Sequence, residues 1–170
     1  MTMGRKAGPA PVVLRADRGR GKSAALGMAA TQLVSECGAR VCVTAARPAA
    51  LASFWAFVAP VCQDAVMFRA PDQLLRHPPE ADVLMVDEAA TLPVPMLTAM
   101  TARWPASVLA TTVHGYEGTG RGFDLRFRDV LDARSPGWQR VVLDEPIRWA
   151  EDDPLEALMN QLLCLDADPL

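Results

Sequence analysis

Short β-branched and apolar runs alternate along the chain with longer segments that are typical of helices. Val12-Val13-Leu14 is one such run, and a segment rich in alanine follows it from Lys22. This alternation favours the α/β class, a parallel sheet covered by helices on both faces. The predicted strands lie near residues 12–16, 40–45, 65–69, 83–87, 107–112 and 140–143. The predicted helices lie near residues 22–37, 49–58, 93–102 and 153–165, with a short turn around 72–76.

Between the first predicted strand and the first predicted helix, residues 16–23 read Ala-Asp-Arg-Gly-Arg-Gly-Lys-Ser, a pattern typical of a phosphate-binding loop. Small residues allow backbone N–H groups to surround a phosphate, and the N-terminus of the next helix adds a partial positive charge. In such loops the lysine, here Lys22, reaches the β- and γ-phosphates, and the hydroxyl of Ser23 ligates Mg²⁺. The usual pattern begins with Gly where this chain has Ala16, and the form with Ala resembles motif I of superfamily-2 helicases.

Two other readings of the same glycines remain open. Gly19 and Gly21 can form an ordinary turn, or they can belong with Ala24 to a dinucleotide-binding fingerprint. The fingerprint requires an acidic residue about 20 positions further on, at the end of the second strand. Residues 44–47 at that point read Thr-Ala-Ala-Arg. The phosphate loop is preferred because the strand, loop and helix that it needs are all predicted in place.

An acidic pair follows the apolar run of residues 83–86. In a nucleotide triphosphatase Asp87 would hold Mg²⁺ and Glu88 would orient the attacking water, since phosphoryl transfer requires positioning and charge neutralisation. Alternatively, the pair caps a helix that begins at Ala89. The phosphate loop upstream favours the catalytic interpretation, with Lys22, Asp87 and Glu88 as catalytic residues and with Ser23 and Asp87 as metal ligands.

Composition fits one globular domain: 170 residues, 51% hydrophobic, with a net charge of −3. Residues 1–143 carry 16 basic and 12 acidic groups (+4), and residues 144–170 carry one and eight (−7). A balance of +4 is smaller than the positive charge that is typical of a nucleic-acid-binding surface. The four cysteines form no C-x-x-C pair, and neither a leader nor a membrane span is evident, so we expect a cytoplasmic protein without membrane contact. Residues 1–10 are expected to be a tail, and residues 11–170 a single domain.

The predicted strand at residues 107–112 delivers two hydroxyls, Thr111 and Thr112, to one edge of the sheet. Ala110-Thr111-Thr112 is similar to the S-A-T segment of helicases, which couples the γ-phosphate to nucleic-acid binding. The alternative is the ordinary preference of threonine for strands.

The segment Gly115 to Phe123 reads Gly-Tyr-Glu-Gly-Thr-Gly-Arg-Gly-Phe, and it resembles the tRNA cytidine acetyltransferase family. The similarity extends over residues 16–26, 87–90, 146–150, 153–156 and 162–166. It implies a RecA-like P-loop ATPase domain, the helicase-like module of enzymes that use ATP to form N4-acetylcytidine in RNA, on elongator methionine tRNA in bacteria. ATP and Mg²⁺ are therefore the expected cofactors, and tRNA and a neighbouring domain are the expected partners.

The resemblance also implies individual roles. Nucleotide contacts fall on Ala16, Asp17, Arg18, Gly19, Arg20, Gly21, Lys22, Ser23, Ala24, Ala25 and Arg148. Arg148 or Arg121 would supply a cation near the γ-phosphate, where charge develops in the transition state; a local salt bridge is the alternative for Arg148. The glycine-rich segment is expected to be a loop that senses the nucleotide, through Gly115, Glu117 and Arg121 together with the two threonines. The alternative is that this loop is only a flexible surface connection.

An acetyl-CoA loop of this superfamily reads [QR]-x-x-G-x-[GA], and none of the glycine pairs of this chain fits it. We therefore expect an ATPase module without the acetyl-transfer site. Two other functions stay open, a structural or interaction module that binds ATP with little turnover and a fragment of a general helicase.

Overall fold

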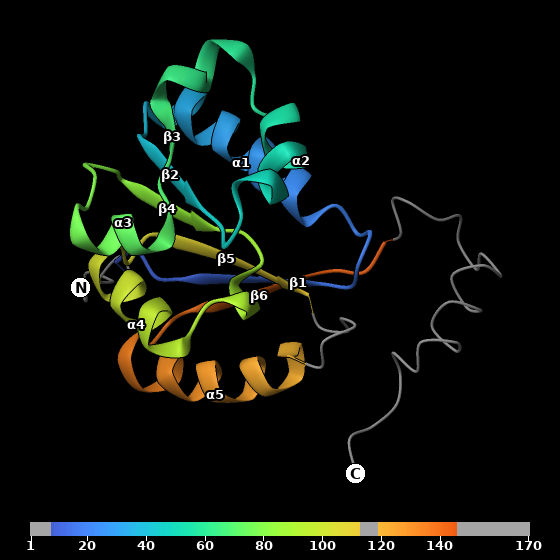
Figure 1. Cartoon of the computed structure of the whole chain (residues 1–170), viewed down its shortest axis with the longest axis vertical. Coiled ribbons are helices and arrows are strands. Elements are labelled where there is room, and N and C mark those ends of the chain that lie inside the picture. The colour runs from blue at the N-terminus through green and yellow to red at the C-terminus, as the bar shows by residue number, and fades with distance from the viewer. Residues whose placement is uncertain (1–7, 113–118, 146–170) are drawn as a thin grey trace, which may run out of the picture.

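The computed structural model describes residues 8–112 and 119–145, with only the backbone described for residues 119–125. Within these residues six parallel strands form one sheet in the order β3-β2-β4-β5-β1-β6 (Figure 1). The strands are β1 (Val12–Ala16), β2 (Val41–Thr44), β3 (Val66–Phe68), β4 (Val83–Val86), β5 (Ser107–Thr112) and β6 (Gln139–Leu143). Because the strands are parallel, all of their carboxyl ends lie at the same edge of the sheet.

Helices cover both faces of the sheet (Figure 1). On one face lie α1 (Lys22–Cys37), the 3-10 helix η1 (Pro48–Leu51), α2 (Ala52–Ala56) and the 3-10 helix η2 (Pro60–Ala65). On the other face lie α3 (Pro71–Arg76), the 3-10 helix η3 (Ala89–Thr91), α4 (Val94–Arg103) and α5 (Thr119–Arg134). Among the described residues, no helix has both the length and the apolar character needed to cross a membrane.

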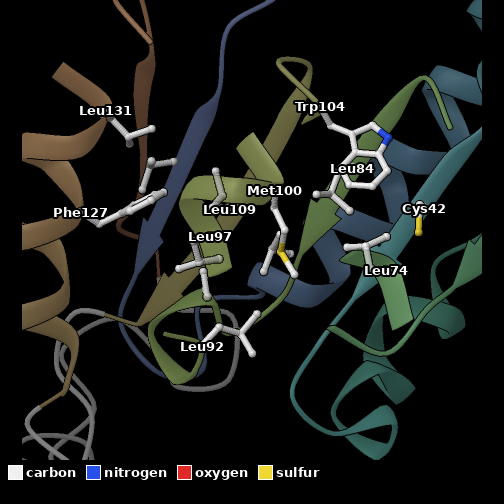
Figure 2. Packing of buried hydrophobic residues seen from close by; sticks show 13 residues of the cluster. Cys42, Leu74, Leu84, Leu92, Leu97, Met100, Trp104, Leu109, Phe127 and Leu131 are labelled. Carbon is white, nitrogen blue, oxygen red and sulfur yellow. The ribbon is translucent and has the colours of Figure 1, made fainter. Parts of the chain in front are cut away.

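The strands separate two hydrophobic cores because successive side chains of a strand point to opposite faces. In β4, Leu84 and Val86 join the core under α3, α4 and α5, whereas Met85 joins the core under α1 and α2. Figure 2 shows the first of these cores, in which Leu84 and Leu109 from the sheet lie near Met100 of α4. A strand that is buried on both faces consists of a continuous run of apolar residues, which is why β4 could be predicted from the sequence.

The structure confirms every predicted strand to within one residue at each end, and it confirms the helices predicted at residues 22–37 and 93–102. The single helix predicted at residues 49–58 is wrong. That region forms η1 and the short helix α2, and η2 follows. Proline accounts for the start of each 3-10 helix, since Pro48 begins η1 and Pro60 begins η2. The helix predicted at residues 153–165 lies outside the described residues.

Part of the glycine-rich segment is helical, contrary to the prediction of a loop. Residues 119–123 are not a loop, because they form the first turns of α5, a helix that the sequence analysis did not predict. Phe127 and Leu131, one helical turn apart, are both only 1% exposed in the core beneath α5. We attribute the helix to this packing, which outweighs the low helix propensity of Gly120 and Gly122.

Candidate functional site

The loop between β1 and α1 has the backbone of a phosphate-binding loop. Ala16 ends β1, and Lys22 begins α1. Gly19 and Gly21 adopt positive φ angles of 83° and 77°, a region open to glycine but unfavourable for residues with a side chain. Gly21 caps α1, and the first turn of α1 contains no acidic residue. The first turn of α1 therefore adds no carboxylate of its own, and the positive end of the helix dipole can attract an anion.

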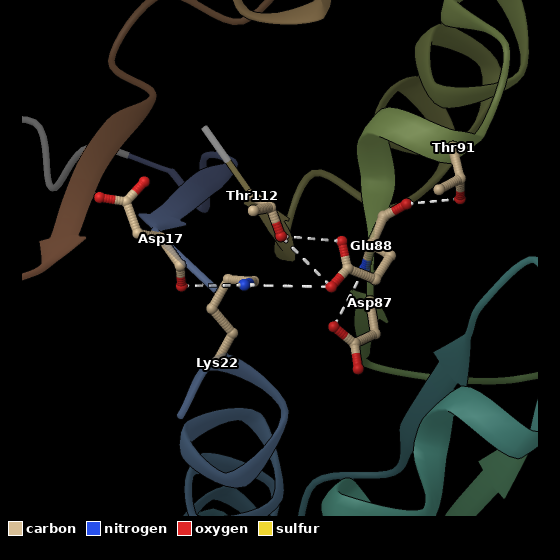
Figure 3. Close-up of polar contacts among 6 residues, drawn as sticks. All are labelled: Asp17, Lys22, Asp87, Glu88, Thr91 and Thr112. Atoms are coloured by element: carbon tan, nitrogen blue, oxygen red, sulfur yellow. Dashed lines mark hydrogen bonds and ion pairs between the residues drawn. The ribbon is translucent and has the colours of Figure 1, made fainter. Parts of the chain in front are cut away.

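The ammonium group of Lys22 lies at the mouth of this loop. Lys22 is only 6% exposed, and its Nζ donates to the Asp17 carbonyl oxygen at 3.5 Å and lies 3.9 Å from Glu88 Oε1 (Figure 3). Burial lowers the pKa of Lys22, and the negative charges of Glu88, Asp87 and Asp17 oppose this effect. The cation thus stands between the loop and the acidic pair.

The acidic pair is placed at the carboxyl end of β4. The Asp87 N–H donates to the Thr44 carbonyl oxygen at 2.9 Å, so Asp87 is tied to the end of β2. Asp87 is fully buried, and its Oδ1 accepts a hydrogen bond from the Glu88 N–H at 3.0 Å. Burial raises the pKa of Asp87, while hydrogen bonding from the Ser23 side chain acts in the opposite direction. The Ser23 side chain therefore lies beside Asp87, and their predicted role as metal ligands stays a prediction.

The second carboxylate oxygen of Asp87 gives a test of whether the site fits Mg²⁺. Oδ2 is buried and has no hydrogen-bond partner of good geometry among the described residues. A buried acceptor of this kind calls for a cation or a water. The described residues contain no group of three or more His, Cys, Asp and Glu that could hold a metal by themselves. Mg²⁺ commonly takes one or two protein oxygens and completes its shell with water and phosphate, so Ser23 and Asp87 suit it.

Glu88 is held in an unusual backbone conformation. It has φ 50° and ψ 51°, and among the described residues no other non-glycine residue has a positive φ. Its carbonyl oxygen accepts a bond from Thr91 Oγ1 at 2.6 Å, and its carboxylate accepts from Thr112 Oγ1 at 3.1 Å and 3.3 Å (Figure 3). Strained residues often occur at functional sites, where their surroundings fix them. At Glu88, the hydrogen bonds from Thr91 and Thr112 hold in place a side chain that is 40% exposed.

The two predicted threonines differ in their surroundings. Thr112 contacts Glu88, whereas Thr111 is 1% exposed, and its hydroxyl has no hydrogen-bond partner among the described residues. Adjacent residues of a strand point to opposite faces, so only one of the pair can face α1 and the acidic pair. Thr91 was not among the predicted site residues, although a threonine three residues after Glu88 is a recognisable turn signal.

Several predicted site residues are not brought together by the described structure. Gly115, Glu117 and Arg148 lie outside the described residues, and Arg121 lies in the first turn of α5 with its side chain undescribed. One relation bears on Arg148. β6 pairs with β1 so that Leu143 lies opposite Ala16, the residue that precedes the phosphate loop. The chain therefore leaves β6 at the edge of the sheet where the loop lies.

Comparison with known proteins agrees with this geometry. Residues 13–166 match the family model described as RNA cytidine acetyltransferase NAT10/TcmA, helicase domain. The chain is 42% identical, over 93% of its length, to the tRNA(Met) cytidine acetyltransferase TmcA of Vibrio cholerae, of which it covers 24%. It is 44% identical, over 92% of its length, to the protein of that name from Nitrosococcus halophilus, of which it covers 23%. The chain thus spans about a quarter of the length of these relatives.

A solved structure supports the fold independently. The Pif1 helicase of Candida albicans superposes on this chain with a TM-score of 0.59 at 14% identity, over 91% of this chain and 40% of that one. At this identity the likeness shows the fold alone, a P-loop sheet of RecA-like type with helices on both faces. The family match covers most of the chain, and the chain therefore belongs to the helicase-domain family of the RNA cytidine acetyltransferases.

Proposed function

We propose that this chain binds Mg-ATP and hydrolyses it slowly, as the helicase-like module of an ATP-dependent enzyme that forms N4-acetylcytidine in tRNA. One observation carries the proposal. The Lys22 ammonium, the unpartnered Oδ2 of Asp87 and the Glu88 carboxylate converge beside a loop with two left-handed glycines. The family assignment and the tRNA in the names of its relatives support the wider role.

Each residue of this arrangement has a distinct task. The backbone of residues 17–21 and the start of α1 bind the phosphates, and Lys22 neutralises charge on the β- and γ-phosphates. Ser23 and Asp87 would hold Mg²⁺, which supplies further charge neutralisation when bound. Glu88 orients the attacking water and accepts its proton, and Thr112 keeps the Glu88 carboxylate in place. An incoming triphosphate must first replace Glu88 as the partner of Lys22.

Arg148 and the segment after β5 belong to the same proposal. Arg148 follows Leu143 by five residues, a span of at most about 18 Å for extended chain. Leu143 pairs with Ala16 and lies five residues before Arg148, which supports Arg148 as the proposed cation for the γ-phosphate. Gly115, Glu117 and Arg121 stand three, five and nine residues after Thr112, and we propose that they transmit the nucleotide state to RNA or to a neighbouring domain.

A second candidate function is an ATP-binding interaction module with little turnover. The observation that favours it is the contact network of Glu88, whose carboxylate is already engaged by Thr112 and lies near Lys22. A general helicase fragment is a weaker candidate, because unwinding requires a second lobe that closes over the nucleotide.

Binding and hydrolysis by purified variants test the proposal. We expect Lys22→Ala to reduce ATP affinity at least tenfold, because it removes the cation that meets the β- and γ-phosphates. We expect Glu88→Gln to bind Mg-ATP within threefold of wild type and to lose most of its turnover. Arg103→Ala is the matched control, since Arg103 is an exposed cation in the last turn of α4. Equal ATP affinity in wild type and Lys22→Ala would contradict the proposed site, and turnover retained by Glu88→Gln would contradict the role of Glu88.

A further inference from the structure

The surface formed by α1, η1, α2 and η2 is depleted of charge. Residues 23–35 and residues 48–63 contain no Asp, Glu, Lys or Arg. The contrast is α5, in which seven of 16 residues are charged: Arg121, Asp124, Arg126, Arg128, Asp129, Asp132 and Arg134. A helix layer that meets only water normally carries charge on its outer side. Depletion of charge is instead the compositional mark of the centre of a protein interface.

Large apolar side chains are exposed on this same surface. Met28 is 52% exposed, Phe57 is 50% exposed and Val61 is 89% exposed. We call these three residues the α1–α2 face. Phe57 adjoins α1 directly, because a Cβ built on Gly27 would lie 3.1 Å from Phe57 Cβ. Single exposed apolar residues are ordinary, but several on one surface of low charge, whose exposed charged residues are Glu36 and Asp64, indicate a binding site.

The face is held in a fixed shape. Thr31 Oγ1 donates to the Phe57 carbonyl oxygen at 3.3 Å and accepts from the Ala59 N–H at 2.9 Å. One turn further along α1, Ser35 Oγ lies 3.4 Å from Cys62 Sγ. The chain is therefore tied to α1 on both sides of Val61, by the backbone N–H of Ala59 and by the side chain of Cys62. A preformed surface loses less conformational entropy when a partner binds than a flexible one does.

The chemistry of the face restricts its partner. It has no cation for the phosphates of RNA or for anionic lipid headgroups, so it suits an apolar protein surface. The Vibrio cholerae and Nitrosococcus halophilus relatives are about four times as long as the segment they share with this chain. We propose that the α1–α2 face is the docking surface for a neighbouring domain of such a longer polypeptide, which covers Met28, Phe57 and Val61 with apolar side chains.

Hydroxyl-radical footprinting tests the proposal on native side chains. The probe is a chimera in which this chain replaces the matched segment of the Vibrio cholerae relative. We expect the oxidation rates of Met28 and Phe57, read by mass spectrometry of their peptides, to fall at least tenfold relative to the isolated chain. His77, exposed at the end of α3, is the control and should keep its rate within twofold. No nucleotide is present, so the result does not depend on the proposed ATPase.

Each other outcome overturns the proposal. Unchanged rates in the chimera mean that no domain covers the face. Slow oxidation in the isolated chain means that its own residues cover it, and protection that grows with the concentration of the isolated chain means that a second copy does. If the chimera does not fold, the intact Vibrio cholerae protein is compared with its excised matched segment over the region aligned with residues 48–63. Equal rates there also count against the proposal.

Discussion

Asp87 and Glu88 are neighbours in sequence but lie in different environments. Asp87 is fully buried, whereas the Glu88 side chain is 40% exposed and accepts hydrogen bonds from Thr112. Burial is the main influence that raises the pKa of Asp87, with hydrogen bonding from Ser23 opposing it. Without a cation, the folded chain is therefore less stable with an ionised Asp87 than with a neutral group there.

This environment predicts that Asp87→Asn raises the melting temperature of the nucleotide-free chain at pH 7.5. Because the folded-state pKa of Asp87 is raised above its unfolded value, ionisation destabilises the fold above the folded pKa and has no effect below the unfolded pKa. The difference in melting temperature should thus shrink as the pH falls through the folded pKa. Asp64→Asn, at an exposed position, is the control and should change little. A lower melting temperature for Asp87→Asn at pH 7.5 would contradict the prediction.

The two threonines at the end of β5 give a matched pair of variants. Thr112→Val removes the hydrogen bonds to Glu88, so we expect at least a tenfold loss of ATP turnover with ATP affinity within threefold of wild type. Thr112→Ser keeps a hydroxyl and should restore most of the turnover. Thr111→Val should leave turnover within twofold, because the Thr111 hydroxyl has no hydrogen-bond partner among the described residues. Equal turnover in Thr112→Val and Thr111→Val would remove Thr112 from the site.

Residues within one motif could be predicted from the sequence, whereas contacts between distant residues could not. Lys22, Ser23, Asp87 and Glu88 were predicted because a phosphate loop and an acidic strand end have local patterns. The hydrogen bond from Thr112 to Glu88 joins positions 24 apart. It depends on the pairing of β4 with β5 and on the left-handed backbone of Glu88, which no local pattern contains. The roles of Arg148 and Arg121 stay predictions.

At the scale of elements, strands buried on both faces, such as β2 and β4, could be predicted from their apolar residues, whereas β6 is an exposed strand at the edge of the sheet. The helix α5 was not predicted, because it begins in a glycine-rich segment, and Phe127 and Leu131 reveal its buried side only once the sheet is known. The helix predicted at residues 49–58 was too long, because η1 occupies its start and α2 ends at Ala56, four residues before Pro60 begins η2. Helix prediction thus failed where tertiary packing and proline outweighed local composition.

The contact between α1 and α2 depends on a glycine. A Cβ built on Gly27 would lie 2.3 Å from the Phe54 carbonyl oxygen, so Gly27→Ala must push the two helices apart. Alanine favours a helix over glycine by about 1 kcal/mol, yet overpacking commonly costs roughly 1–3 kcal/mol. We therefore expect net destabilisation in urea denaturation. Met28→Ala, the exposed neighbour, is the control and should change the stability little. A more stable Gly27→Ala chain would show that the helices separate freely.

At the scale of the whole molecule, the strand order assembles the site. β1 lies beside β5, and β5 lies beside β4, so the phosphate loop, Thr112 and the acidic pair end at one edge of three adjacent strands. The sequence predicted a parallel sheet and its strands, but strand order depends on which crossovers pack best, and the apolar runs do not encode that. The single domain predicted for residues 11–170 stays a prediction.

The isolated chain is not expected to acetylate tRNA. The family model for the helicase domain accounts for residues 13–166, and no glycine pair of the chain fits an acetyl-CoA loop. We therefore expect the purified 170-residue chain, given Mg-ATP, acetyl-CoA and tRNA, to form no N4-acetylcytidine above background, as read by mass spectrometry of digested tRNA. The full-length Vibrio cholerae relative is the positive control. Acetylcytidine formed by the isolated chain would mean that the surface of this sheet holds an acetyl-transfer site of a kind that its glycine patterns do not reveal.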